Sequence, residues 1–485
     1  MTRPPITRLE LLRYLLSPPL YVMMVLLVCE ALASAATTWL VIRAGRDVAN
    51  GELLVVFLIW ILVVQSSSYA VGAVSWVFAE RAGFRAFSRY MARFARDNRA
   101  QTKLLHDRHA REQVEPFLTG ETFHSIFRLM YEAESQLKLL LALIFNAIVL
   151  GVEIDGSLPA AYGAVFVILM LIQWSFRKRV AAIYLENQRQ NNRVTAHGYT
   201  AWDNVFSGNR YNLHLWYDGF KAKLRDCLRA QIAAILTREG LSATGAIIGL
   251  TIVFITMTTI AIRDVGNTEI LIALAATLPR QIEMTNDVHQ LATDWNDVLA
   301  AWARIGGVAA NMRPDSDPAF DERIKFDRLT LREGDRELEC GTVPDALAQV
   351  LAQPTGRITI RGGNGSGKST LLAALKAEIK NRAYYWPTSD RLAFRFTGQL
   401  PEPEIDLDAD GEVIVKKKRR RPGFSSGERQ LRSLQEIVAH TDAAIYLLDE
   451  WDANLDTKNR AAADAMVQEL ASRARVVEIS HRDRA

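Results

Sequence analysis

The residues from 362 to 370 have the types and spacing that bind phosphate. Their sequence, Gly362-Gly363-Asn364-Gly365-Ser366-Gly367-Lys368-Ser369-Thr370, matches the P-loop pattern G-x-x-x-x-G-K-S/T. The glycines let backbone N–H groups surround phosphate oxygens, and a helix that begins after the loop adds the positive end of its dipole. We expect Lys368 to reach the β- and γ-phosphates of ATP and the Ser369 hydroxyl to ligate Mg²⁺.

A second group of residues could complete this chemistry. The apolar run 443–448 ends in Asp449 and Glu450. An acidic residue at the end of a buried strand beside a P-loop helps to hold Mg²⁺, so we assign that role to Asp449. The next carboxylate, Glu450, can orient and deprotonate the attacking water. Together the two groups predict ATP hydrolysis, with ATP and Mg²⁺ as cofactors.

The flanking segments have the composition needed to position these residues. The β-branched run 357–361 predicts a buried strand before the loop, and 371–375 is a good helix former. A polar stretch with Gly and Pro precedes this region, and we take 311–322 as a linker. We therefore expect an α/β P-loop NTPase domain over 323–485.

The first 310 residues have the composition of a membrane domain. Leu20 to Ile42 is almost wholly apolar, and as a helix it is long enough to cross a hydrocarbon core about 30 Å thick. Six spans are expected, at 20–42, 53–79, 137–152, 158–176, 242–262 and roughly 268–290. The sixth is the weakest, because Pro279, Arg280 and Glu283 interrupt it. We therefore predict an all-α six-helix transmembrane domain over 1–310.

The distribution of Lys and Arg predicts the orientation of these spans. The long segments 81–128 and 177–238 are rich in these basic residues taken together, whereas the alternate turns are short and nearly free of them. By the positive-inside rule the long segments and both termini are cytoplasmic, so we expect a multi-pass protein of the cell inner membrane. Gly and aromatic residues interrupt the long segments at 113–120 and 200–208. There we expect short helices that dock a cytoplasmic domain.

Other features exclude several classes of protein. Cys29, Cys227 and Cys340 are far apart and show no metal-binding or redox spacing, which argues against a disulfide scaffold. The basic run 416–421 follows an acidic series over 402–412, and such charge runs are usually solvated. With a net charge of only +4, we expect no nucleic-acid partner.

Glu30 lies within the first apolar span. A carboxylate at the centre of a bilayer costs roughly 3 kcal/mol. Either the side chain faces a substrate cavity, or it is satisfied locally near a helix end or at a helix–helix contact. Of the two interpretations we favour the cavity, and the local one stays open.

Four short motifs resemble those of the ABC ATPases. Ser425 and Gly427, in Phe424-Ser425-Ser426-Gly427-Glu428-Arg429-Gln430, lie in a segment similar to the ABC signature. Gln399 resembles the Q-loop residue, Asp456 the D-loop residue and His481 the switch histidine. With six spans ahead, the whole chain resembles a half-transporter of the ABC exporter type (type IV). The resemblance is specific over 357–485 and rests on topology over 1–310.

The resemblance implies a homodimer. ATP would lie between the P-loop of one chain and Ser425 and Gly427 of the other, with Asp456 close by. Gln399 would join Ser369 and Asp449 around Mg²⁺, and Glu450, His481 and Gln399 would be the catalytic residues. The segments 113–120 and 200–208 would be the coupling helices of an alternating-access cycle.

The resemblance also bears on the substrate. Trp451, directly after Asp449-Glu450, is similar to the residue of bacterial cyclic-peptide and siderophore-peptide exporters. We therefore expect export of a peptide or another amphipathic small molecule.

Some residues depart from the family pattern. Aligning 325–329 with the family's first strand puts Glu333 where an adenine-stacking aromatic usually lies, and Ser426 replaces a glycine. The segment 400–423 is shorter than the usual helical subdomain, so slow turnover is expected. The alternatives are a membrane protein that binds ATP for gating or regulation, and an importer with an exporter fold. A soluble ABC ATPase of DNA repair or translation is disfavoured by the apolar spans.

Overall fold

The computed structural model describes residues 7–49, 54–315, 317–388, 392–397, 404–407, 413–416, 425–453 and 455–480. These residues form two compact units. One contains 7–90 and 120–309, and the other contains 91–119 and the described residues from 310 onward. The second unit thus takes in part of the region that the sequence assigned to the membrane domain.

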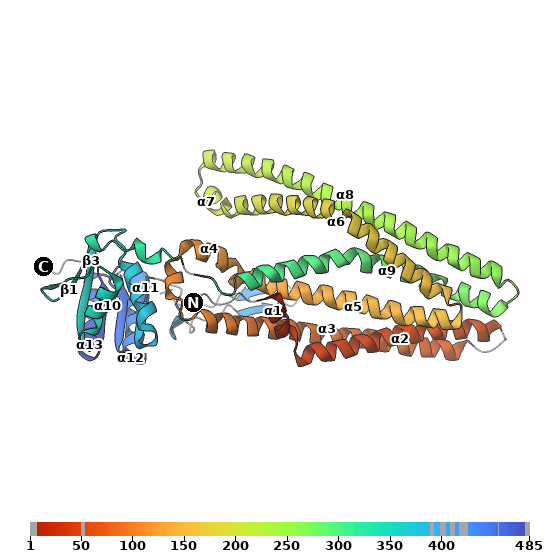
Figure 1. Cartoon of the computed structure of the whole chain (residues 1–485), viewed down its shortest axis with the longest axis horizontal. Helices are drawn as coiled ribbons and strands as arrows, with labels where there is room; N and C mark the ends of the chain where they lie inside the picture. The colour runs from red at the N-terminus through yellow and green to blue at the C-terminus, as the bar shows by residue number, and fades with distance from the viewer. Residues whose placement is uncertain are drawn as a thin grey trace. The chain divides into compact units, whose positions relative to one another are not determined.

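The first unit is helical throughout (Figure 1). Its helices are α1 (Arg8–Leu15), α2 (Pro18–Ala49), α3 (Val55–Asn98), α5 (Thr122–Glu153), α6 (Ser157–Tyr199), α7 (Ala201–Phe206), α8 (Arg210–Arg263) and α9 (Thr268–Ala310). The end of α3 from Met91 onward belongs to the second unit. The prediction that the N-terminal region is all-α is confirmed.

Among the described residues, five helices are long and apolar enough to cross a membrane by length and composition, namely α2, α3, α5, α6 and α8. Only 6% to 28% of the most apolar stretch of each is buried. Helices with so much exposed apolar surface are consistent with a membrane protein. The sixth predicted span corresponds to α9, which contains Pro279 and is too polar to count with the other five.

The helices pack through a core shared by α2, α5, α6, α8 and α9. It contains Leu150, Leu158, Val165, Val253, Ile260, Met284 and Val288, none of which is more than 1% exposed. Ion pairs hold the short connections at one end of this core, including Arg46 with Glu153 at 2.7 Å and Arg263 with Asp155 at 2.5 Å. Apolar side chains therefore pack together on the inward faces of the helices, and the outward faces are apolar as well.

Glu30 is satisfied at a helix–helix contact. Its Oε1 lies 2.7 Å from Nζ of Lys138 on α5, and the residue is 8% exposed. Gly72 on α3 makes room for the carboxylate, because a Cβ there would lie 2.8 Å from Oε1. This geometry favours the local interpretation of Glu30. Its other oxygen, Oε2, is buried without a hydrogen bond.

The second unit contains a mixed sheet with the order β2-β1-β3-β8-β7-β4. The strands are β1 (Leu329–Glu333), β2 (Arg336–Leu338), β3 (Gly356–Gly362), β4 (Ala383–Trp386), β7 (Ile445–Asp449) and β8 (Arg475–Ile479). Strands β3, β8, β7 and β4 are parallel, and β1 is antiparallel to both β2 and β3. A separate antiparallel pair is formed by β5 (Glu404–Leu407) and β6 (Val413–Lys416). Lys416 is the one residue of the basic run 416–421 that lies in a described strand.

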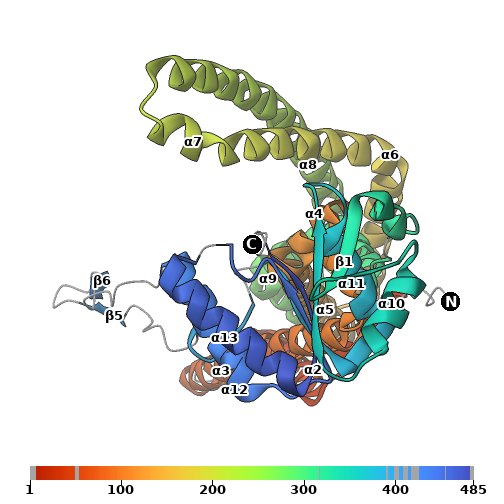
Figure 2. The ribbon, with the colours of Figure 1, turned by 90° about the vertical axis from the view of Figure 1, so that its left-hand side faces the viewer.

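Helices cover both faces of the six-stranded sheet (Figure 2). They are α10 (Val343–Leu351) and α11 (Lys368–Ile379) on one face, and α12 (Ser426–His440) and α13 (Thr457–Arg473) on the other. Strand β7 supplies both cores, because Ile445 and Leu447 point to the first face and Tyr446 and Leu448 to the second. This burial on both faces explains why 443–448 is apolar without alternation.

The first strand begins later than predicted. Residues Phe326–Arg328 form a 3₁₀ turn, and β1 starts at Leu329. Glu333, at the end of β1, pairs with Arg475, which is 1% exposed. At the position where the resemblance placed an aromatic residue, the partly exposed Glu333 side chain is thus engaged in an ion pair with a buried arginine. Within the expected linker, Phe320 is 1% exposed and lies in the turn Phe320–Arg323.

Residues 91–119 pack on this unit through the turn η1 (Thr102–His106). Thr102 Oγ1 donates to the Ala373 carbonyl of α11 at 3.2 Å, and His106 Nε2 lies 2.6 Å from the Tyr385 hydroxyl of β4. The predicted segment 113–120 follows, and forms the end of α4 (Arg108–Pro116) and most of the π-helical turn η2 (Phe117–Glu121). The contact with α11 therefore comes from a turn that precedes the predicted docking segment.

Candidate nucleotide-binding site

The loop between β3 and α11 is rich in glycine, and the lack of side chains leaves its backbone accessible to a ligand. Gly365 has φ of 76° and Gly367 has φ of 92°, both in the left-handed region. A Cβ at Gly367 would also lie 2.7 Å from the Arg323 carbonyl oxygen. The strand–loop–helix arrangement expected for 357–375 is thus present, with α11 beginning at Lys368.

Lys368 lies across this loop. Its Nζ donates to the carbonyl oxygens of Gly362 and Gly363, at 2.8 and 3.1 Å. Ser366 is 2% exposed, and its Oγ has no hydrogen-bond partner. Asn364 is exposed, and Thr370 lies in the first turn of α11. The loop therefore places the positive charge of Lys368 at the N-terminus of a helix. This electrostatic setting favours the binding of anions.

Ser369 and Asp449 meet beside the loop. Ser369 lies in the first turn of α11, and Asp449 is the last residue of β7. Ser369 Oγ donates a hydrogen bond to Asp449 Oδ1 at 3.0 Å. Asp449 is 3% exposed, and its Oδ2 is buried without a hydrogen bond. Burial raises the pKa of this carboxyl to about 6, and the neighbouring Glu450 adds to the shift.

This pair fits the chemistry of Mg²⁺. A hydroxyl and a carboxylate are hard oxygen ligands, and the unpartnered Oδ2 supplies a free acceptor. Among the described residues, no group of three or more His, Cys, Asp or Glu side chains could hold a metal. Mg²⁺ usually takes only one or two protein ligands together with phosphate and water, so Ser369 and Asp449 suffice for such a site.

Glu450 has an unusual backbone. Its φ is 49°, a left-handed conformation that costs about 1–3 kcal/mol in a residue other than glycine. Gln430 Nε2 of α12 donates to the Glu450 carbonyl at 3.0 Å. Such strain clusters at functional sites, so this geometry supports a functional role for Glu450. The sequence placed Gln430 in the signature-like segment 424–430 but did not predict this contact, because no local pattern indicates that two residues so far apart in the chain will meet.

The turn after Glu450 is anchored in the core. Trp451 is 3% exposed, and its indole N–H donates to Glu478 of β8 at 2.8 Å. Arg357 of β3 donates to both oxygens of Glu478, at 2.7 and 2.6 Å. Trp451 is thus part of a buried network that holds the turn after Asp449. Its presence has a structural explanation that does not involve a substrate.

The predicted signature residues lie at the start of α12. Ser425 caps this helix, since its Oγ accepts from Glu428 N at 3.2 Å and Glu428 Oε2 accepts from Ser425 N at 2.9 Å. Gly427 lies in the first turn. No hydrogen bond joins Ser425 or Gly427 to the loop 362–369 of the same chain in the part that the structure describes. Their contact with ATP across a dimer stays a prediction.

The remaining predicted residues divide into two groups. Asp456 caps α13, because its Oδ1 accepts from Asn459 N at 2.7 Å. This capping bond accounts for the residue locally, and its place beside ATP stays a prediction. Gln399 and His481 lie outside the described residues.

Compared with known proteins, this chain matches no protein-family model and no curated protein. Its own residues and their geometry therefore indicate its function.

Proposed function

We propose that the protein is an ATP-driven membrane transporter of the ABC exporter type. The hydrogen bond between Ser369 and Asp449 beside the loop 362–369 carries the proposal. It lies in a chain that also contains five helices apolar enough to cross a membrane. A nucleotide-hydrolysing site joined to a membrane domain is the composition of an active transporter.

Each residue of the site has a specific task in this proposal. Bound MgATP supplies a phosphoanhydride bond whose hydrolysis is strongly favourable. The loop N–H groups and Lys368 bind its phosphates, while Ser369 and Asp449 hold the metal. Glu450 orients the attacking water and accepts its proton. Gln430 holds the Glu450 carbonyl in place, and the Trp451–Glu478 bond holds the residue that follows.

Transport requires a second copy of the chain. One chain has one phosphate-binding loop and one signature segment, so the proposed homodimer places ATP between the loop of one copy and Ser425 and Gly427 of the other. Closure of the two nucleotide domains would then alternate the access of a cavity in the inner membrane. The proposed substrate is a peptide or another amphipathic small molecule, and Trp451 does not favour one class over the other.

The test is ATP hydrolysis by the full chain in lipid nanodiscs. We expect slow, Mg²⁺-dependent turnover that Glu450→Gln lowers by roughly 10²-fold or more, while ATP binding is retained. Glu469→Gln, on the exposed face of α13, is the matched control and should leave turnover unchanged. If wild type and Glu450→Gln bind ATP but turn over equally little, the chain is instead an ATP-binding regulator or gate.

A further inference from the structure

Five titratable side chains lie in a row where α2 and α3 meet α5. Tyr131, Glu134 and Lys138 of α5 follow one another at intervals of three and four residues, so they share one face of that helix. Glu30 of α2 lies 2.7 Å from the Lys138 ammonium, and Glu80 of α3 accepts a hydrogen bond from the Tyr131 hydroxyl. Such side chains are rare within membrane helices and usually mark a pathway or a binding site.

Polar side chains continue this row towards the other end of α5. Ser34 of α2 accepts hydrogen bonds from Arg280 of α9 at 2.5 Å and from Asn146 of α5 at 3.3 Å. From Tyr131 to Glu153, α5 rises about 33 Å, which matches a hydrocarbon core about 30 Å thick. Polar groups therefore recur along the whole apolar length of this helix.

Glu134 is buried without a partner. The residue is 7% exposed, and no hydrogen bond or ion pair reaches its carboxylate from the described part of the chain. Lys138, one turn along α5, and Glu30 are the two charged groups that act on it electrostatically. Since the Lys138 ammonium lies 2.7 Å from Glu30, the three side chains carry one negative charge in excess when all are ionised. The second Glu30 oxygen, Oε2, is likewise buried without a hydrogen bond.

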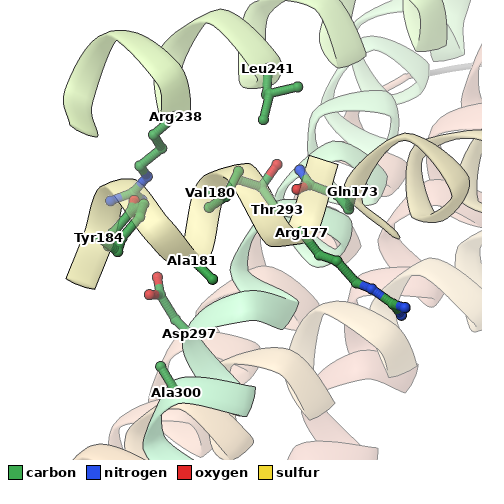
Figure 3. A pocket seen from close by; sticks show the side chains of 10 residues that line it. All are labelled: Gln173, Arg177, Val180, Ala181, Tyr184, Arg238, Leu241, Thr293, Asp297 and Ala300. Atoms are coloured by element: carbon green, nitrogen blue, oxygen red, sulfur yellow. The ribbon is translucent and has the colours of Figure 1, made fainter. Parts of the chain in front are cut away.

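The other cations of the surrounding helices are already opposed. Arg128 of α5 lies 3.9 Å from Asp297, which lines a separate cavity of about 220 Å³ between α6, α8 and α9 (Figure 3). Arg280 lies 2.7 Å from Glu283. The apolar stretches of α2, α3 and α6 contain no Lys, Arg or His, at 18–42, 65–79 and 157–176. Within the described residues, Glu134 thus has no second cation to balance it.

We propose that Glu134 binds a proton inside the membrane helices and releases it once in each transport cycle. The proton comes from water and forms an O–H bond on the carboxylate, which cancels the excess charge while Lys138 stays charged opposite Glu30. The partly exposed Glu80 and the Tyr131 hydroxyl begin the route to it, and release returns the proton to water. Rows of carboxylates within membrane helices are typical of proton relays. The release rests on the proposed function, whereas the binding does not.

Infrared spectroscopy of the full chain in dodecyl maltoside, a detergent without carbonyl groups, tests the binding. At pH 8 exposed carboxyls are ionised, and so is Asp449, whose pKa is raised to about 6. We expect the wild type to keep a carboxylic C=O band that shifts in D₂O, and Glu134→Gln to lack it. Glu269→Gln, at an exposed position of α9, is the matched control and should keep the band.

Glu30→Gln separates charge balance from burial. It frees Lys138 to oppose Glu134, so the pH at which the band disappears should fall by about one unit or more. Circular dichroism checks that each variant keeps its helical content, and if Glu134→Gln does not fold, the titration of Glu30→Gln decides alone. A wild type without a band at pH 8, or an unchanged titration in Glu30→Gln, would overturn the proposal.

The release is tested by adding ATP and Mg²⁺ to Glu450→Gln. Closure of the nucleotide domains should weaken the band at pH 8, because the proton leaves in one of the two conformations. A band that MgATP leaves unchanged would reject the release. A chain that binds no ATP would overturn the proposed function and the release with it, whereas the spectra without nucleotide decide the binding separately.

Discussion

The Ser369 hydroxyl donates a hydrogen bond to Asp449 Oδ1 at 3.0 Å, which joins the first turn of α11 to the end of β7. These residues are far apart in the sequence, yet the parallel pairing of β3, β8 and β7 brings them together. The other Asp449 oxygen is buried and unpartnered. This relationship leads to the first prediction.

Asp449 should weaken the fold in the absence of Mg²⁺. Its pKa, raised by burial to about 6, exceeds the usual 3.8 of an unfolded chain, so ionisation is costly in the folded state. The cost is complete above pH 6 and disappears below about pH 4. Asp449→Asn should therefore raise the unfolding temperature of the Mg²⁺-free protein at pH 7.5, by an amount equivalent to a few kcal/mol at most, and the gain should shrink as the pH falls.

Thermal unfolding at pH 7.5 and pH 4.5 measures this difference. Adding Mg²⁺ with a non-hydrolysable ATP analogue should reverse the order, because only the wild type retains the carboxylate ligand. A stabilisation of Asp449→Asn that is independent of pH would contradict the account. Asp442→Asn, at an exposed position before β7, serves as the control.

Gln430 should act as a positioning residue for Glu450. Gln430→Ala removes the hydrogen bond to the strained Glu450 carbonyl, so kcat should fall about tenfold with little change in KM. Gln468→Ala, on an exposed part of α13, should have no effect. Steady-state ATPase kinetics separate the two parameters, and a fall that is expressed only in KM would assign Gln430 to binding instead.

The network around Glu478 should stabilise the nucleotide-binding unit. Trp451→Phe removes one hydrogen bond to Glu478 and should cost about 1–2 kcal/mol. Glu478→Ala leaves Arg357 without its buried partner and should cost about 3–5 kcal/mol. Chemical denaturation monitored by tryptophan fluorescence gives both values. If the two substitutions cost the same, the ion pair with Arg357 contributes nothing to stability.

The pair Glu30–Lys138 should show strong coupling. Lys138→Met leaves the Glu30 carboxylate unpaired among membrane helices, and the melting temperature in detergent should fall by several degrees. Adding Glu30→Gln should restore most of the loss, because the double variant buries no unpaired charge. A double-mutant cycle in thermal unfolding measures the coupling, and additive losses would show that the two side chains act independently.

Local sequence pattern predicts part of this structure well. The run 357–361, the glycine loop and the helix at Lys368 were each visible as short patterns, because glycine spacing and β-branched composition act over few residues. The apolar spans were equally clear, since their length alone indicates a membrane helix. The candidate site was therefore identifiable before any tertiary contact was known.

Contacts between distant segments were not predictable in this way. Arg475 pairs with Glu333, and His106 lies against Tyr385, but neither residue belongs to a local pattern. The predicted start of the first strand was wrong for a similar reason. Phe326 packs on the core from a 3₁₀ turn, and its residue type alone resembles that of a strand residue. Helix α9 is not among the five candidate membrane helices, because polar side chains interrupt its apolar pattern.

The most direct test is a cryo-electron microscopy structure of Glu450→Gln in nanodiscs with ATP and Mg²⁺. The account predicts a closed homodimer in which the phosphates lie in the loop 362–369 of one copy, with Mg²⁺ beside Ser369 and Asp449. Ser425 and Gly427 of the second copy should face the same nucleotide. Nucleotide density away from this loop, or a metal that neither Ser369 nor Asp449 approaches, would contradict the proposed function.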